Sequence, residues 1–231
     1  MKNKLSINLT ELSGKLLLHV KKHEDTTITQ TLLENITVER LTDELNTDDV
    51  KKCFWINIYN AYYQLLALKY NQTRGDIFKR KEIKIARNQF SLDDIEHGIL
   101  RKYRWKFSLG YLPNIFVSVL IKKLTVNVVD YRIHFALNCG AISCPPIAFY
   151  KIEQINTQLE NAMFSFIEAE TEIDETKKTI QTSKLMLWFK GDFGGKRGIK
   201  QMLEYVFEKE LNGYKINYKA YNWDKSLANF S

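Results

Sequence analysis

The stretch CFWINIYNAYYQLLALKY, residues 53–70, is apolar around nearly its whole circumference and contains neither Gly nor Pro. A helix that is hydrophobic on all sides is buried, so this segment predicts a buried helix. Asn57, Asn60 and Gln64 fall on one narrow stripe of that helix. A solvent-facing stripe would usually carry Lys or Glu, so these neutral amides indicate either a polar pocket or internal hydrogen bonds to the backbone. We take Asn57 and Asn60 as candidate substrate-binding residues.

Further helices and strands are predicted on both sides of this stretch. Apolar residues recur at helical spacing in residues 5–22, 28–46, 152–166 and 199–207. Strand patterns occupy residues 81–87, 130–139, 179–189 and 214–218. Because helices outweigh strands, the pattern favours an α+β fold, a helix-rich single domain around a central, mainly antiparallel sheet. We expect residues 1–48 to form an N-terminal helical segment that packs on a single α+β domain of residues 49–231.

The composition is that of a folded chain. Of the 231 residues, 45% are hydrophobic and 13% are aromatic, which is enough to bury a sizeable core and excludes wholesale disorder. Lys and Arg exceed Asp and Glu by 34 to 27, a net charge of +7. This modest excess is spread along the chain, so we predict a solvated basic surface and no specific nucleic-acid binding.

Neither a membrane span nor a signal peptide is expected. No stretch approaches the ~20 apolar residues that a membrane-spanning helix needs, and His19, Lys21 and Lys22 closely follow the apolar residues 16–18. The three cysteines are an odd number and too few for a disulfide scaffold. We therefore predict a reducing, cytoplasmic location with thiols free to react.

A further helix is predicted to start at Ser91. The sequence Ser91-Leu-Asp-Asp94 has the Ser-x-x-Asp pattern of a helix N-terminus. At helical spacing, Glu96 falls inside an apolar arc and His97 lies at its flank. A carboxylate aimed at the core is costly unless it is paired. Glu96 is therefore either a structural residue bonded to a buried Arg or to backbone amides, or an acid/base or orienting carboxylate with a histidine or reacting group as its partner.

The predicted strand over residues 130–139 carries a second polar group. Period-two alternation places His134, Ala136 and Asn138 on one face and three apolar residues on the other. A lone strand histidine is more often a satisfied core or surface residue. Here Cys139 follows directly, which favours a functional interpretation of His134 and Asn138.

Cys139 and Cys144 allow three interpretations. One thiol is a nucleophile activated by an imidazole, or the pair forms a reversible disulfide if the two Cα atoms come within about 7 Å. The third is a zinc site with His134 and Glu96 or His97. The five-residue spacing is not that of a zinc knuckle, so we favour the nucleophile and assign no metal and no cofactor. Backbone amides at Gly140 could serve an oxyanion.

Four motifs in this order resemble the family known as domain of unknown function 547. They are FWINIYNA at 54–61, SLDDIEHGILR at 91–101, HFALNCGA with SCPP at 134–146, and DFGG at 192–195. The family is distantly similar to papain-like and transglutaminase-like thiol enzymes. In those enzymes the nucleophilic cysteine begins the central helix, where this chain has Cys53, and the histidine lies on a later strand, as His134 does. Two pairings therefore compete, Cys139 with a nearby histidine and Cys53 with His134.

These observations lead to one favoured hypothesis, a thiol-dependent hydrolase or acyltransferase. It would act on an amide, thioester or isopeptide bond of a small molecule or peptide, with Cys139 as nucleophile and His134 or His97 as base. Glu96 would orient the base, and Asn57, Asn60, Asn138 and Cys144 would contact the substrate. The alternatives are a non-catalytic binding or scaffold module with a structural His/Glu/Cys cluster, and a metal site.

Overall fold

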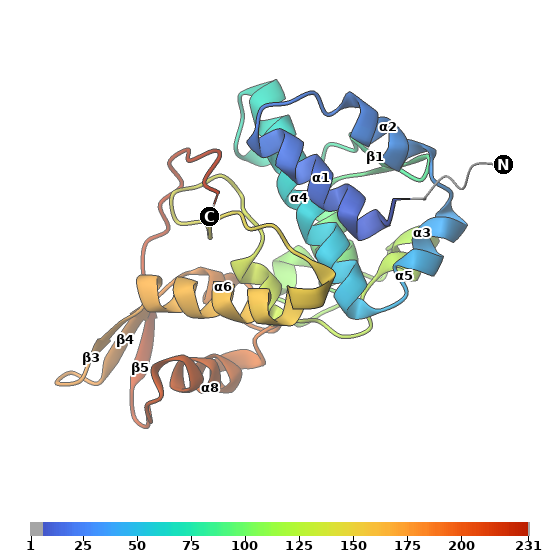
Figure 1. Cartoon of the computed structure of the whole chain (residues 1–231). Helices are drawn as coiled ribbons and strands as arrows, with labels where there is room; N and C mark the ends of the chain where they lie inside the picture. The colour runs from blue at the N-terminus through green and yellow to red at the C-terminus, as the bar shows by residue number, and fades with distance from the viewer. Residues whose placement is uncertain (1–6, 231) are drawn as a thin grey trace.

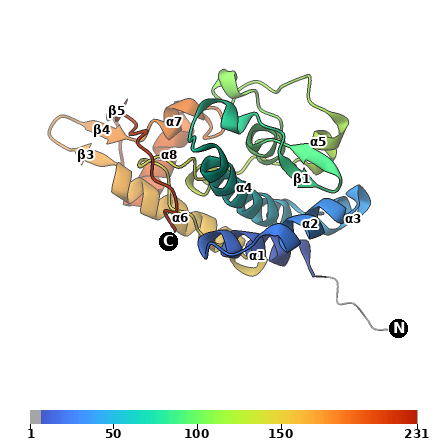
Figure 2. The ribbon, with the colours of Figure 1, turned by 90° about the horizontal axis from the view of Figure 1, so that it is seen from above.

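A long helix, α4 (Asp48–Tyr70), runs through the middle of the fold (Figures 1 and 2). The computed structural model describes residues 7–230. Thr47 caps α4 by accepting a hydrogen bond from the Val50 amide, and Asp48 and Asp49 lie in its first turn, where the helix dipole favours negative charge. Almost every residue from 51 to 67 is buried. The predicted buried helix is confirmed and begins five residues earlier than predicted.

The N-terminal segment forms three helices, of which the first packs on α4. α1 (Leu9–Lys21) packs along it, followed by α2 (Thr27–Asn35) and α3 (Val38–Glu44). The predicted helix over residues 28–46 is divided, because the chain is extended at Ile36 and Thr37 and the Thr37 side chain caps α3. The start of the predicted helix over residues 5–22 lies outside the described residues. Apolar residues of α1 and α4 belong to the same core.

The strands form two small sheets, with α4 rather than a sheet at the centre. β1 (Ile83–Ile85) and β2 (Asn88–Phe90) make an antiparallel hairpin. β3 (Glu172–Asp174) pairs antiparallel with β4 (Thr179–Thr182), which pairs in parallel with β5 (Lys215–Tyr218). The fold is thus α+β and rich in helix, as predicted, with mainly antiparallel strands.

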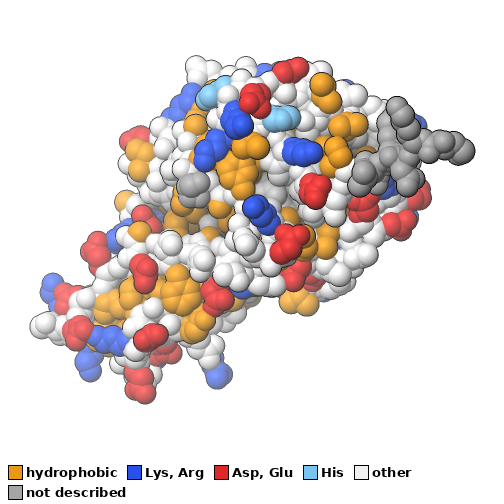
Figure 3. Space-filling view, in the orientation of Figure 1, with side chains coloured by type: hydrophobic (Ala, Val, Ile, Leu, Met, Phe, Trp, Pro, Cys, Tyr) orange, Lys and Arg blue, Asp and Glu red, His pale blue; other side chains and the backbone are white. Residues whose placement is uncertain are grey.

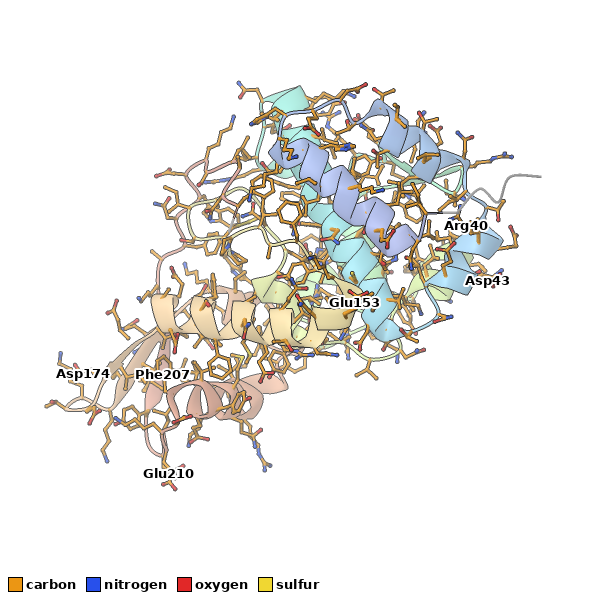
Figure 4. All side chains as sticks on the ribbon, viewed as in Figure 1. Arg40, Asp43, Glu153, Asp174, Phe207 and Glu210 are labelled. Carbon is orange, nitrogen blue, oxygen red and sulfur yellow. A yellow bond between two sulfur atoms is a disulfide. The ribbon has the colours of Figure 1, made fainter. Side chains whose placement is uncertain are left out.

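The C-terminal third builds a second core. α6 (Ile155–Glu170) and α8 (Gly195–Phe207) lie side by side, and side chains fill the space between them, with Phe207 packed against this cluster (Figure 4). Both helices confirm the periodicity of their sequences. The predicted strand over residues 179–189 is only half right, since β4 ends at Thr182 and the short helix α7 (Leu185–Trp188) follows.

The predicted strand over residues 130–139 is wrong. Tyr131–Phe135 forms the 3₁₀ helix η4, and the chain beyond it is irregular. The Asp130 side chain caps this turn by accepting from the Arg132 amide, and the buried Asn60 binds the backbone on either side of Leu137. These side-chain bonds take the place of the hydrogen bonds of a strand.

Shorter helices complete the chain between these parts. They are η1 (Gly75–Phe78), η2 (Asp94–Leu100), η3 (Lys106–Ser108), α5 (Val119–Leu124) and η5 (Ile152–Gln154). None of the helices within residues 7–230 combines the length and the apolar character that crossing a lipid bilayer demands.

Candidate functional site

A cavity of about 230 Å³ gathers most of the predicted site residues. Its wall comes from α4, η2, the turn after η4, α7 and the C-terminal segment. Glu96, His97, His134, Cys139 and Cys144 all line it. Further residues that line the cavity were not predicted, among them Tyr59, Asp93, Lys106, Trp188, Phe189, Tyr221 and Trp223.

The π-helix η2 (Asp94–Leu100) presents the first side of the cavity. Ser91 and Asp94 cap each other: the Ser91 amide donates to Asp94 Oδ2 at 2.8 Å, and the Asp94 amide donates to Ser91 Oγ at 3.0 Å. The predicted helix start is therefore confirmed, although the turn that follows is wider than an α-helix. Such π-turns are rare and occur frequently at functional sites.

A buried ion pair joins η2 to the distant DFGG motif. Arg101 Nε donates to Asp192 Oδ2 at 2.5 Å, and both side chains are fully buried. His134 Nε2 lies 2.9 Å from the same oxygen, and Arg101 Nη1 lies 2.7 Å from His97 Nδ1. The Phe189 ring stacks on His134 at 3.9 Å and lies under the Arg101 guanidinium at 4.5 Å. One network thus holds both histidines.

His134 and Asp192 form an oriented His–Asp dyad. Burial would raise the pKa of Asp192, but hydrogen bonds from His134 and Arg101 outweigh it and hold that pKa below its ordinary value. An ionised carboxylate only accepts hydrogen bonds, so His134 carries its proton on Nε2. Burial lowers the pKa of His134, although Asp192 opposes the shift. Nδ1 of His134 is therefore a free lone pair, and it makes no hydrogen bond within residues 7–230.

His97 is held neutral in the same Nε2–H tautomer, but through a different partner. A guanidinium has no acceptor, so His97 Nδ1 accepts from Arg101 and Nε2 carries the proton. Burial, and then the charge of Arg101, lower the pKa of His97 to about 3. Its Nε2 faces Asp93 Oδ1 at 3.6 Å, and Asp93 pairs with Lys106 at 2.5 Å. His97 is thus a hydrogen-bond donor toward the cavity rather than a base.

The carboxylate that orients His134 is Asp192 rather than Glu96. Glu96 accepts a hydrogen bond from the Tyr59 hydroxyl at 3.2 Å, and its Oε1 lies 3.6 Å from His97 Nδ1. Arg101 and Asp192 were not predicted as site residues, although both stand inside motifs that carry the family resemblance. Glycines on both sides of Asp192, at 191 and 194, were the available signal of a constrained position.

Cys139 and Cys144 form a disulfide, with their Cα atoms 6.1 Å apart. The structure therefore agrees with the second interpretation of this pair, a disulfide. The expectation of free thiols is wrong for Cys139 and Cys144. Cys139 is partly exposed to the cavity, whereas Cys144 is buried. The Tyr221 hydroxyl lies 3.1 Å from Cys144 Sγ and 3.5 Å from Cys139 Sγ.

The backbone amides of this turn are already engaged. The Cys139 amide donates to Cys144 Sγ at 3.2 Å, and the Gly140 amide donates to Asn138 Oδ1 at 2.8 Å. The expected oxyanion site at Gly140 is therefore occupied by Asn138. Gly140 has φ of +68°, and a Cβ there would overlap the Tyr63 side chain, so only glycine fits this close approach.

The predicted amide residues lie outside the cavity and hold the backbone. Asn60 donates to the Ala136 carbonyl at 2.9 Å and accepts from the Asn138 amide at 2.9 Å. Asn57 binds Tyr150 in the same two-sided way, and Asn138 donates to the Pro145 carbonyl. All three asparagines are fully buried. The amide stripe of α4 therefore makes internal hydrogen bonds, the second of its two predicted interpretations.

Cys53 does not meet His134. It lines a different cavity, and its thiol donates to the Tyr150 carbonyl at 3.3 Å. Burial raises the pKa of Cys53 to about 12, so this thiol stays protonated near neutral pH. Within residues 7–230 no cluster of three or more His, Cys, Asp or Glu side chains is arranged to hold a metal ion. The geometry therefore lends no support to the Cys53–His134 pairing or to the alternative of a zinc site.

The comparisons with known proteins give one match. A family model described as "Protein of unknown function, DUF547" matches residues 42–167. No curated protein and no solved structure matches the chain. The matched range covers α4, η2 and the disulfide turn, and it ends before Asp192.

Proposed function

The chain belongs to the DUF547 family, and we propose that its reduced form is a thiol-dependent hydrolase or acyltransferase acting on an amide, thioester or isopeptide bond. One observation carries the proposal: Cys139, Cys144 and His134 line a single cavity, and Asp192 binds the imidazole of His134. Nucleophile, base and orienting carboxylate are the three parts that covalent acyl transfer needs.

A small thiol reduces the Cys139–Cys144 disulfide to two free thiols. The reductant supplies the two electrons and is itself oxidised to a disulfide. Cys139 is the proposed nucleophile, because it is the more exposed of the two residues. Its proton passes to Nδ1 of His134, whose Nε2–H remains bonded to Asp192. A reducing compartment is the setting in which this dithiol form persists.

The thiolate then attacks the acyl carbon of the substrate. A carbon–sulfur bond forms, and the bond to the leaving amine or thiol breaks as the His134 imidazolium returns its proton to that group. Water completes hydrolysis of the resulting thioester, or an amine completes acyl transfer, with His134 again taking the proton. The neutral His97, with Nε2–H as its donor, would bind the carbonyl oxygen, since it cannot compete with His134 for the proton.

The walls of the cavity favour a substrate with an apolar or aromatic group. The rings of Trp188, Tyr221 and Trp223 pack together, with centroids 4.5 to 5.4 Å apart. The Arg74 guanidinium lies over the Trp223 ring at 4.9 Å. Asp93 and Glu96 line the same cavity as this aromatic wall, so we expect a peptide or small molecule with an uncharged acyl part.

The test is capture of an acyl-enzyme in reduced protein. An activated aryl thioester is added, and intact mass and peptide mapping locate the acyl group. We expect one acyl group on Cys139, its loss in Cys139→Ser, and its retention in Cys144→Ser. In His134→Gln we expect at least a hundredfold slower acylation. Acylation that survives Cys139→Ser at full rate, or equal rates with and without reduction, would refute the proposal.

A structural role for the cluster is the second candidate. The observation that favours it is the complete burial of Arg101 and Asp192, since breaking a buried ion pair costs about 3–5 kcal/mol. Under this alternative His134→Gln lowers stability as much as Asp192→Asn does, and reduced wild type forms no acyl-enzyme. Urea unfolding of the two variants, measured beside the acylation assay, distinguishes the two candidates.

A further inference from the structure

A loop beside the cavity exposes an unusual number of large apolar side chains. Among the described residues, sixteen large apolar side chains are exposed, and eight of them lie between residues 105 and 119. Phe116 is 90% exposed, Ile115 75% and Phe107 73%. We call these eight residues the 105–119 patch: Trp105, Phe107, Leu109, Tyr111, Leu112, Ile115, Phe116 and Val119.

The loop that carries the patch is a built structure. Its two arms are tied by hydrogen bonds from the Trp105 amide to the Leu112 carbonyl at 2.9 Å and from the Asn114 amide to the Tyr103 carbonyl at 2.6 Å. Arg104 donates to the Tyr111 carbonyl across the same loop. In Figure 2 this loop projects with α5 on the side of α4 away from α1 and α2. The backbone of this loop is therefore ordered, although its apolar side chains are exposed to water.

The charged side chains of the loop and α5 are all basic, and Asp93 outside this segment pairs with one of them, Lys106. From Gly98 to Val129 the sequence contains six Lys and Arg residues and neither Asp nor Glu. Arg101 is buried and Lys106 pairs with Asp93, which leaves four other basic residues around the loop and α5: Lys102, Arg104, Lys122 and Lys123. On the face drawn in Figure 3, by contrast, acidic and basic side chains are mixed. A loop that exposes eight large apolar side chains indicates a site of interaction.

We propose that the 105–119 patch docks this protein on an anionic lipid surface. Aromatic and aliphatic side chains enter the boundary between headgroups and acyl chains, while basic residues beside them meet the anionic headgroups. Trp105 and Tyr111 are the residue types that favour this boundary. A nucleic acid would bind the basic groups and stack on the aromatic rings, but it would leave the aliphatic Leu112, Ile115 and Val119 without a partner.

The patch is joined to the dyad through two glycines. The Gly191 amide donates to the Leu109 carbonyl at 2.7 Å, and a Cβ on Gly110 would overlap Asp192 Oδ1 and lie 2.9 Å from the Asp192 amide. His97 and Lys106 line the cavity described above and also a second cavity under the loop. Docking would therefore bring the catalytic cavity close to the lipid surface. The proposed docking rests on the exposure and charge of the 105–119 patch and does not depend on the proposed reaction.

Sedimentation with vesicles tests the docking. The full chain is mixed with phosphatidylcholine vesicles that either contain or lack phosphatidylserine. We expect binding to the anionic vesicles that weakens as salt is raised. Combined Phe107→Ser, Ile115→Ser and Phe116→Ser should lower the partition coefficient at least tenfold. Combined Lys122→Gln and Lys123→Gln should lower it about fivefold for each lysine.

The control variant removes three exposed apolar side chains elsewhere on the surface. Ile28, Leu32 and Leu68 are exposed but lie outside the patch, so their combined change to Ser should leave vesicle binding unchanged. Circular dichroism verifies that each variant is folded. The proposal is overturned if wild type ignores anionic vesicles, or if the control and patch variants bind equally. Patch-dependent dimers in gel filtration, without vesicle binding, would also overturn it in favour of self-association.

Discussion

His97 contributes a pH-dependent part of the stability of this protein. Its folded pKa of about 3 lies below the ordinary value of about 6.5. The stabilisation is fully present above pH 6.5 and is lost as pH falls toward 3, because only the unfolded chain then gains the proton. Between pH 7 and pH 5 this amounts to about 2 kcal/mol.

Replacing His97 by Gln should remove that part of the dependence, because Gln still offers Arg101 an acceptor and does not titrate. Urea unfolding of wild type and His97→Gln at pH 7 and at pH 5 measures the effect. The loss on acidification should be smaller in the variant by about 2 kcal/mol. Equal losses would mean that His97 is not the neutral, buried imidazole described above.

Replacing Gly110 is also expected to lower the free energy of unfolding strongly. Its φ is +86°, and a Cβ would overlap the Asp192 carboxylate. Gly213 is the matched control, with φ of +81° and open space around it. We expect Gly213→Ala to cost about 1 kcal/mol for the positive φ alone and Gly110→Ala to cost about 3 kcal/mol. Chemical unfolding gives both values, and similar costs would argue against close contact between the loop and Asp192.

At the scale of elements, the amide stripe of α4 shapes the turn that carries both His134 and Cys139. Asn60→Ala would leave the Ala136 carbonyl and the Asn138 amide buried without partners. We expect a loss of about 3 kcal/mol in the free energy of unfolding. Asn35→Ala, on the exposed face of α2, should change it by less than about 0.5 kcal/mol. A small effect at Asn60 would instead indicate that water replaces the amide.

Helices were easier to predict than the site. Apolar spacing located α1, α4, α6 and α8, and the Ser91–Asp94 pattern located the start of η2, because these signals are local. The alternation over residues 130–139 predicted a strand wrongly, because the side chains of Asn60 and Asp130 bind the backbone there in place of a neighbouring strand. His134 and Asp192 are 58 positions apart, and no local pattern connects such partners.

For the whole molecule, the Cys139–Cys144 disulfide ties stability to redox state. Closing a short loop restricts the unfolded chain, which stabilises the fold by about 2 kcal/mol. Reduction should therefore lower the free energy of unfolding by that amount and leave the protein folded. Urea unfolding with and without a reductant measures the difference, and mass spectrometry counts the thiols. Finding both thiols free in air-oxidised protein would contradict the disulfide.

The central claim is that the His134–Asp192 dyad activates Cys139, and the pH dependence of iodoacetamide alkylation tests it most directly. In reduced protein, mass spectrometry follows each of the three cysteines in wild type, His134→Gln and Asp192→Asn. We predict that Cys139 reacts fastest, with a midpoint below the ordinary value of about 8.5. Both variants should raise that midpoint, and Cys53 should stay unreactive because burial raises its pKa to about 12. A Cys139 midpoint near 8.5 that neither variant moves would contradict the account.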